Sequence, residues 1–304
     1  MSMEKYKVTV VTLTYNNWDK IHTAIKSLAK QSIDEHIDIE YLIVDDGTEN
    51  FNLEYVEELV RNNLNIKTRI IINKRNLGTV KSFNNAIKQS YGDFIIPLSA
   101  DDEFYANDVI NNIMAEFVNS NAEIVTARRM PYEEGNRAAF ASLPTEAQIK
   151  LFTNNVELLK YILKHGSFIS GACTYYRKSL LMRLGFFDEE YVLLEDYPFL
   201  VKALLNGVGI NYVNIVAIKY RLGGVSNIAK RHPLLEKDFR RLYKNISVMP
   251  QLNPYWKRRI FYLKVLTPSE KIKILNIMKY PEQFIYFCLK RFGKIFGYNI
   301  ERLR

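Results

Sequence analysis

The chain has 304 residues, of which 48% are hydrophobic and 25% are charged, and its formal net charge at pH 7 is +9. This composition excludes a mainly disordered chain, and the length allows one large α/β domain with or without an appendage. The two cysteines, Cys173 and Cys288, are too few for a disulfide framework or a cysteine-rich metal cluster, and they fit a reduced, cytoplasmic compartment.

The positive charge is concentrated at the end of the sequence. Residues 1–256 hold 30 Lys and Arg against 30 Asp and Glu, whereas residues 257–304 hold 12 basic residues and three Glu. A neutral body with a basic tail indicates an anionic surface as a partner. The first eleven residues lack the apolar core of a signal peptide, and no stretch reaches the ~18 apolar residues that span a bilayer.

The first hundred residues alternate between strand and helix patterns. Strands are expected at 7–14, 40–44, 68–72 and 93–97, and helices at 20–31, 53–62 and 80–90. This alternation predicts an α/β fold with a mostly parallel sheet, flanked by helices and wound by right-handed crossovers.

The next hundred residues show a looser pattern. Helices are expected at 109–118, 156–164 and 197–206, and a last strand at 210–220, before the turn signal Gly223-Gly224. Residues 127–143 are polar and irregular, which predicts a flexible loop. Residues 167–176 are rich in small side chains and are expected to pass close to a ligand.

Polar clusters follow three of the predicted strands. They are Tyr15-Asn16, Asp45-Asp46 and Asp101-Asp102. Ligands of open α/β sheets bind beyond the carboxyl ends of the strands, so these clusters are expected to meet at one edge of the sheet.

Each acidic pair has a functional and a structural interpretation. Asp101 and Asp102 are suited to hold Mg²⁺ or Mn²⁺ together with substrate phosphates, or one of them caps the helix that starts near Asn107. Asp45 and Asp46 are suited to accept from a nucleotide base or ribose, or they form an Asx-turn with the following glycine.

A third acidic pair, Glu195-Asp196, precedes a predicted helix. It is suited to act as a general base, or it caps that helix. Alone, each of the three pairs favours the structural interpretation. Their occurrence at several strand ends of one α/β unit favours a ligand site.

The order of these motifs resembles family 2 glycosyltransferases, which are inverting enzymes of the GT-A fold. The resemblance covers residues 6–222 and divides into a donor half, 1–105, and an acceptor half, 106–222, followed by a helical basic extension, 223–304. It is carried by Tyr15-Asn16, Val44–Thr48, Asn76-Leu77-Gly78, Asn84-Asn85-Ala86, Leu98–Asp102, Gly185–Asp188 and Leu194–Tyr197.

The resemblance also implies roles for single residues. Tyr15 would stack near the base, and Asp46, with Asp45, would bind uridine. The donor-binding set also includes Asn76, Gly78, Asn84 and Asp101. Asp101 and Asp102 would bind the metal, and Asp196 would be the catalytic base, with Glu195 beside it. Many family members carry an Asp where this chain has Ser99, which leaves open which of the two Asp residues binds the ion directly.

The activity that the resemblance implies is the inverting transfer of a hexose or N-acetylhexosamine from a UDP-sugar to a hydroxyl of a saccharide acceptor. The expected setting is bacterial surface polysaccharide synthesis (O-antigen or capsule), with an acceptor linked to a polyprenyl diphosphate. The chain lacks the Gln-x-x-Arg-Trp sequence of processive synthases, so a single addition is expected. The alternatives are a nucleotidyltransferase, which a missing Gly-rich phosphate loop disfavours, and a non-catalytic membrane-surface scaffold.

The tail has its own pattern. Residues 281–298 place apolar side chains at helical spacing beside Lys290, Arg291 and Lys294. This is typical of a basic amphipathic helix at the inner face of the cell membrane, and equally of a helix packed on the domain. Nucleic acid is disfavoured as a partner because the aromatic residues form an apolar stripe rather than a stacking platform.

Overall fold

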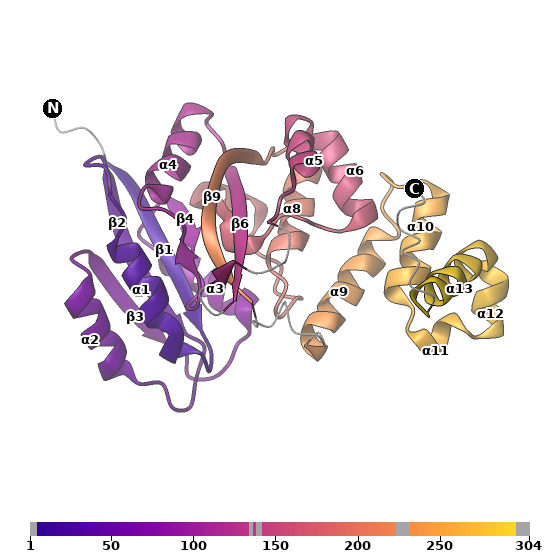
Figure 1. The fold of residues 1–304 in the computed structure, drawn as a ribbon, viewed down its shortest axis with the longest axis horizontal. Helices are drawn as coiled ribbons and strands as arrows, with labels where there is room; N and C mark the ends of the chain where they lie inside the picture. Colours follow the sequence, from indigo (N-terminus) through magenta and orange to yellow (C-terminus); the bar gives the residue numbers. More distant parts are fainter. Residues whose placement is uncertain (1–4, 134–135, 138–141, 223–231, 296–304) are drawn as a thin grey trace. The chain divides into compact units, whose positions relative to one another are not determined.

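The computed structural model describes residues 5–133, 136–137, 142–222 and 232–295 (Figure 1). The chain forms two compact units. The first comprises Met1–Ile162 and Gly166–Leu235, and the second comprises Leu163–His165 and Glu236–Arg304. The predicted domain bounds at 1–222 and 223–304 stay predictions, and the Gly223-Gly224 turn lies outside the described residues.

Strands of the first unit form one sheet in the order β3-β2-β1-β4-β8-β6-β9-β5, with β7 paired to β6. The first four of these strands run parallel to one another, as predicted, and β6 is parallel to β9. Strand β8 is antiparallel to β4 and β6, β5 is antiparallel to β9, and β7 is antiparallel to β6. The strands are β1 (Tyr6–Thr14), β2 (Ile37–Asp45), β3 (Lys67–Ile72), β4 (Phe94–Pro97), β5 (Glu103–Phe104), β6 (Ile124–Glu133), β7 (Asn136–Arg137), β8 (Thr174–Arg177) and β9 (Asn211–Arg221).

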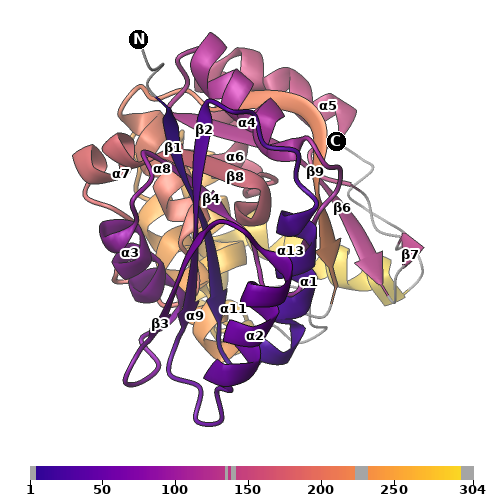
Figure 2. The same cartoon turned by 90° about the vertical axis from the view of Figure 1, so that its left-hand side faces the viewer.

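Helices of the first unit cover both faces of the sheet. Successive side chains of a strand point to opposite faces, so Val8 and Val10 of β1 pack into the core cluster that holds residues of α1, α2 and α4. Figure 2 shows α3 on the side of the sheet opposite α1 and α2. The helices are α1 (Ile21–Ala29), α2 (Leu53–Asn63), α3 (Thr79–Gln89), α4 (Val109–Asn119), α5 (Glu146–Ile149), α6 (Asn155–His165), α7 (Lys178–Leu184) and α8 (Asp196–Leu205).

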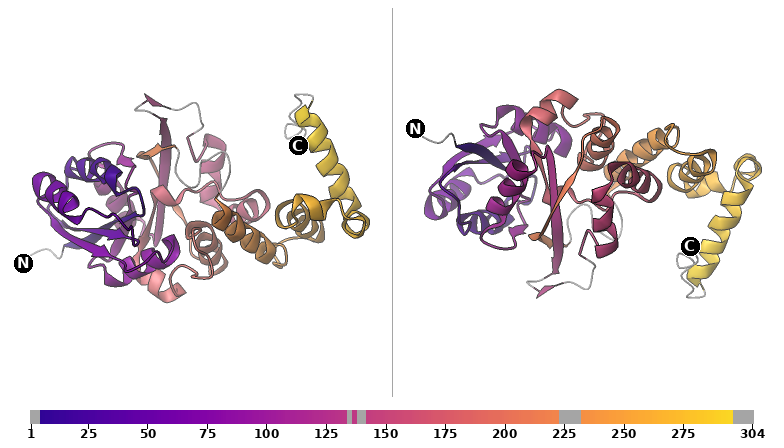
Figure 3. Two further views of the ribbon diagram at one scale, coloured as in Figure 1. Left: turned by 90° about the horizontal axis from the view of Figure 1, so that it is seen from below. Right: turned by 90° about the horizontal axis from the view of Figure 1, so that it is seen from above.

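The loop expected over residues 127–143 is wrong in its first half, because β6 continues to Glu133. Strands β6 and β9 lie side by side along this stretch (Figure 3), and their pairing shifts register around Arg128. Backbone hydrogen bonds from β9 stabilise the strand, so half-buried polar side chains are tolerated there without an apolar pattern. Strand β8 was also missed, because the four residues Thr174–Arg177 are too few to show a clear strand pattern.

The second unit is helical, as predicted for the extension. Its helices are α9 (Pro233–Ile246), α10 (Pro254–Ile260) continued by the π-helical turn η4 (Phe261–Val265), α11 (Pro268–Lys271), α12 (Ile274–Lys279) and α13 (Pro281–Ile295). Figure 3 shows α13 as one continuous helix. The remainder of the helix expected at 281–298 lies outside the described residues. None of the described helices combines the length and apolar character that crossing a bilayer demands.

Candidate active site

A cleft of about 470 Å³ lies at the carboxyl ends of β1, β2 and β4, where the sequence placed the ligand. It is lined by the loops that follow these strands, by the turn before α3 and by residues near the start of α8. The predicted site residues that line it are Tyr15, Asp46, Asn76, Gly78, Asp101, Asp102 and Glu195.

Asp45 joins the loops after β1 and β2. Its buried carboxylate accepts hydrogen bonds from Thr14 Oγ1 at 2.9 Å and from the Thr48 N–H at 2.7 Å. Thr48 Oγ1 in turn accepts from the N–H of Asn16, which has a φ of 57°. These bonds hold Tyr15 at the cleft with its side chain 48% exposed, available to contact a ligand.

Asp46 organises the turn before α3. Its carboxylate accepts from Asn73 Nδ2, Ser82 Oγ and the N–H groups of Leu77 and Gly78, at 2.5–2.9 Å. A carboxylate has about four acceptor sites, so these bonds use its capacity in this conformation. Binding of uridine by Asp46 stays a prediction, and it requires at least one of these bonds to open.

Gly78 brings this turn against the segment before Glu195. Its φ is +86°, and a Cβ at this position would lie 2.7 Å from Val192 Cγ1. The N–H of Val80 donates to the Val192 carbonyl oxygen at 3.2 Å. Only glycine permits this approach, which links the two halves of the cleft.

Asn84 lies away from the cleft lining. Its Nδ2 donates to the Phe187 carbonyl oxygen and to Glu189 Oε1, and its Oδ1 accepts from the Phe187 N–H. The side chain therefore fixes the loop before Tyr191. A direct contact of Asn84 with a nucleotide stays a prediction.

Asp101 and Asp102 occupy the end of the segment after β4 and both line the cleft. Asp102 is 1% exposed. Its Oδ1 accepts from the Arg221 N–H at 2.9 Å, whereas its buried Oδ2 has no hydrogen-bond partner among the described residues. An orphaned carboxylate oxygen beside a second carboxylate fits a hard divalent cation.

The remaining ligands of such a cation would come from outside the protein. The described residues contain no group of three or more His, Cys, Asp or Glu side chains placed to hold a metal ion. Two carboxylates completed by substrate phosphates and water suit Mg²⁺ or Mn²⁺. Burial raises the pKa of Asp102 to about 8. The hydrogen bond from the Arg221 N–H lowers this pKa, whereas the nearby Asp101 raises it.

The acidic pair Glu195-Asp196 lies at the start of α8. Glu195 lines the cleft, whereas Asp196 lies behind Gly171, whose N–H donates to Asp196 Oδ2 at 3.0 Å. The N–H of Tyr197 donates to Oδ1 at 2.7 Å. Burial raises the pKa of Asp196, and the two N–H groups act against that increase.

The family profile described as Glycosyl transferase family 2 matches residues 9–185, which is more than half of the chain. The chain belongs to glycosyl transferase family 2. The matched segment includes the ends of β1, β2 and β4, which border the cleft.

The chain covers different shares of the curated proteins that it resembles. An uncharacterized glycosyltransferase of Methanocaldococcus jannaschii is 25% identical over 291 residues, covering 91% of this chain and 95% of that protein. The poly(ribitol-phosphate) β-N-acetylglucosaminyltransferase TarS of Staphylococcus aureus is 29% identical over 215 residues, covering 70% of this chain and 35% of TarS.

Solved structures share the fold. TarS 1–349 in complex with UDP-GlcNAc superposes with a TM-score of 0.60 at 21% identity, covering 92% of this chain and 79% of that one. The mannosyltransferase PcManGT from Pyrobaculum calidifontis, in complex with GDP-Man and Mn²⁺, gives 0.59 at 14% identity, covering 95% and 76%. These matches confirm the predicted GT-A fold.

Arg129 is a residue of this transferase that the sequence pattern did not reveal. It lies on β6, with its guanidinium 4.2 Å from the centre of the Tyr220 ring, which lines the cleft. Its charge lowers the pKa of both Asp102 and Asp196, against the larger effect of burial. Residues 127–143 were expected to form a loop. For this reason Arg129 was not considered as a cation that lowers the pKa of both carboxyl groups.

Proposed function

We propose that this transferase moves a hexose or N-acetylhexosamine from a UDP-sugar to a hydroxyl of a saccharide acceptor, with inversion at the anomeric carbon. One observation carries the proposal: a single cleft is lined by Tyr15, the Asp101-Asp102 pair and Glu195, with Asp196 directly behind Gly171. The relative TarS, which is bound to UDP-GlcNAc in a solved structure, supports UDP as the nucleotide.

The donor is bound by the loops after β1 and β2. Tyr15 provides an exposed aromatic face beside the turn formed by Asn76 and Gly78, and an aromatic ring is suited to stack on a nucleotide base. Asp45 and Asp46 keep these loops in place through buried hydrogen bonds. Tyr15 then contacts the base and the two carboxylates position the loops, and Asp46 also binds uridine when one of its hydrogen bonds opens.

Mn²⁺ or Mg²⁺ would be held by Asp101 and Asp102, and when bound it supplies positive charge for the departing diphosphate. Asp102 contributes the orphaned Oδ2. Its raised pKa favours the protonated carboxyl group when no cation is bound, and a nearby divalent cation favours the carboxylate instead. Asp101 is the more exposed of the two and faces the space where donor phosphates would lie.

Asp196 accepts the proton of the attacking hydroxyl. Its pKa is raised by burial, which makes the carboxylate a stronger base than an exposed Asp. The N–H groups of Gly171 and Tyr197 fix its two oxygens, so it is positioned before the acceptor binds. Attack from the face opposite the departing UDP gives inversion in one displacement.

The acceptor is lipid-linked in this proposal, and the protein works at the inner face of the cell membrane in polysaccharide synthesis. The second unit exposes large apolar side chains on α12 and α13 beside basic residues, a combination that suits the headgroup layer. Each of these residues is more than half exposed: Ile274, Leu275 and Met278 of α12, Ile285 and Leu289 of α13, and Ile272, which precedes α12.

Calorimetry with UDP, GDP and dTDP, each with and without Mn²⁺, tests the donor assignment. We expect Mn²⁺-dependent binding of UDP and much weaker binding of the other two nucleotides. Binding of no nucleotide would support the alternative of a non-catalytic scaffold. Binding of nucleoside triphosphates with pyrophosphate release would support a nucleotidyltransferase.

A further inference from the structure

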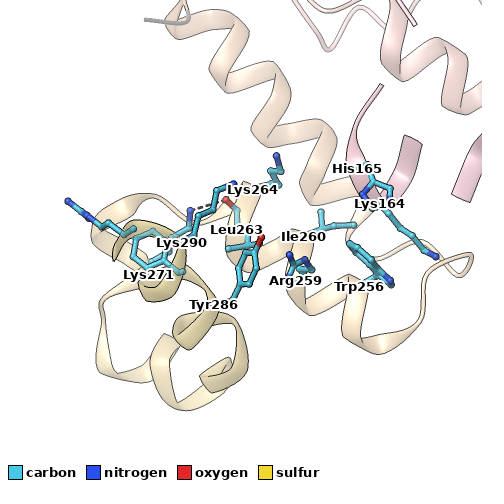
Figure 4. A pocket seen from close by; sticks show the side chains of 12 residues that line it. Lys164, His165, Trp256, Arg259, Ile260, Leu263, Lys264, Lys271, Tyr286 and Lys290 are labelled. Atoms are coloured by element: carbon cyan, nitrogen blue, oxygen red, sulfur yellow. Dashed lines mark hydrogen bonds between the residues drawn. The ribbon is translucent and has the colours of Figure 1, made fainter. Parts of the chain in front are cut away.

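A second cavity lies within the helical unit, and its lining is strongly basic. It has a volume of about 690 Å³ and is lined by residues 164–165 and by residues of α10, η4, α11 and α13, all of the second unit (Figure 4). Seven of its twelve lining residues are Lys, Arg or His, and none of the described lining residues is Asp or Glu.

Basic residues line both ends of the cavity and its middle. Figure 4 shows Lys264, Lys271 and Lys290 toward one end, and Lys164 toward the other, with Arg259 between them. Two acidic side chains of the unit are engaged elsewhere. Glu270 pairs with Arg240 at 2.6 Å and Glu282 pairs with Arg258 at 2.9 Å, and neither arginine lines the cavity.

Arg259 is the central cation and is 6% exposed. Its guanidinium lies 3.9 Å from the centre of the Tyr286 ring, and its Nη1 donates to the Tyr255 hydroxyl at 3.2 Å. A guanidinium has five N–H donors, so this contact leaves donors available for an anion. A buried, stacked arginine presents these donors in a fixed plane, which matches the oxygens of a phosphate.

The charged form of Lys271 is disfavoured at its position in the cavity wall. Its pKa lies below the ordinary value because burial disfavours the ammonium and because Lys264 is close by. Its Nζ donates to the Leu263 carbonyl oxygen at 2.8 Å, so the group is fixed in place. An anion between these two lysines would relieve the repulsion.

We propose that this cavity binds a phosphate group, as a diphosphate or a phosphodiester, of the acceptor substrate. The cavity provides several cations, its described lining residues include no carboxylate, and Trp256, Tyr286 and Phe287 supply apolar surface for the part of the ligand next to the phosphate. The identification with the acceptor rests on the proposed function, whereas the phosphate site itself does not.

Binding of inorganic pyrophosphate, measured by calorimetry at fixed salt on the full chain, tests the site. The double variant Lys264→Gln/Lys290→Gln removes two charges from the lining, and we expect its affinity to fall about tenfold or more. Lys244→Gln/Lys273→Gln removes two charges from exposed positions of the same unit that do not line the cavity, and we expect its affinity to change less than twofold.

Three outcomes would overturn the proposal. These are no binding of pyrophosphate to the wild type, an equal loss in both double variants, and unchanged binding in the cavity variant. An equal loss would mean that only the net charge of the unit attracts the anion. Far-ultraviolet circular dichroism checks that both double variants are folded. If the cavity variant is misfolded, Lys290→Gln alone replaces it.

Vesicles separate a soluble phosphate from a lipid surface as the source of the anion. We expect the cavity variant to sediment with phosphatidylglycerol vesicles as the wild type does. If it lost vesicle binding and kept pyrophosphate binding, the charges would serve a membrane surface and the proposal would be wrong.

UDP binding, measured on the same variants, separates this proposal from the proposed function. We expect the cavity variant to bind UDP with Mn²⁺ like the wild type. If the wild type bound pyrophosphate at this cavity but no UDP, the proposed function would fail while the phosphate site would remain.

Discussion

The cleft of the sheet unit and the cavity of the helical unit concentrate charge of opposite sign. In the cleft, burial raises the pKa of Asp102 and Asp196; in the cavity, burial lowers the pKa of Lys271. In each place a charged form is disfavoured by the protein alone, so a ligand of opposite charge is favoured. The cleft therefore suits a divalent cation with its donor, and the cavity suits a phosphate.

The two regions also differ in what holds the charges. Backbone N–H groups and buried hydrogen bonds fix the carboxylates of the cleft, whereas aromatic rings flank the cations of the cavity, as at Arg259 and Lys271.

Asp196→Asn should have the largest effect. An amide cannot accept the proton of the acceptor hydroxyl, so we expect sugar transfer to fall by about 10³-fold or more. Mn²⁺-dependent binding of UDP should change less than twofold, because Asp196 lies on the acceptor side. Glu195→Gln is the comparison variant and should lose less activity than Asp196→Asn; a larger loss there than in Asp196→Asn would make Glu195 the base.

Asp102→Asn should weaken Mn²⁺-dependent binding of UDP about 100-fold, because it replaces the orphaned carboxylate oxygen with a neutral group. Calorimetry with and without Mn²⁺ measures this loss. Asp93→Asn removes an exposed carboxylate just before the other end of β4 and should leave binding unchanged. Unaltered affinity in Asp102→Asn would exclude this residue as a metal ligand.

Arg129→Gln should shift the pH dependence of transfer. Its charge lowers the pKa of Asp196 against the dominant effect of burial, so its removal raises the pH at which the base loses its proton. We expect the acid limb of kcat/KM to move to higher pH. The same limb in wild type and variant would mean that Arg129 does not act on the base.

The smallest expected effect is on stability without metal. The native pKa of Asp102, about 8, lies above the unfolded value of about 4, so the native state keeps a proton that the unfolded chain loses between these pH values. The free energy of unfolding in EDTA should therefore decrease with rising pH, by about 1.4 kcal/mol per unit for this group. Urea unfolding at pH 5, 6 and 7 should show a shallower decrease in Asp102→Asn.

The sequence predicted the donor side of the fold better than the rest. Strand ends followed by polar pairs are local signals, so the positions of Tyr15, Asp46 and Asp101 at one edge followed from the alternation of strands and helices. The role of Asp46 in fixing the turn before Gly78 depends on contacts about thirty residues apart, which no local pattern shows.

The acceptor side was harder to predict because its strands rely on distant partners. Strand β6 pairs with β8 and β9, and its polar outer half resembles a loop, so Arg129 was not considered. The basic tail was visible as a charge imbalance. Its arrangement around a cavity depends on how α10, η4 and α13 pack, which composition does not determine.

Release of UDP from UDP-hexoses and UDP-N-acetylhexosamines by the purified protein, with Mn²⁺ or with EDTA, tests the proposed activity most directly. We expect at least one UDP-sugar to be turned over with Mn²⁺ and EDTA to abolish the release, and we expect Asp196→Asn to reduce transfer to a saccharide acceptor without reducing UDP binding. Turnover that is equally fast in EDTA, or none with any UDP-sugar while another nucleotide sugar is used, would contradict the proposed activity.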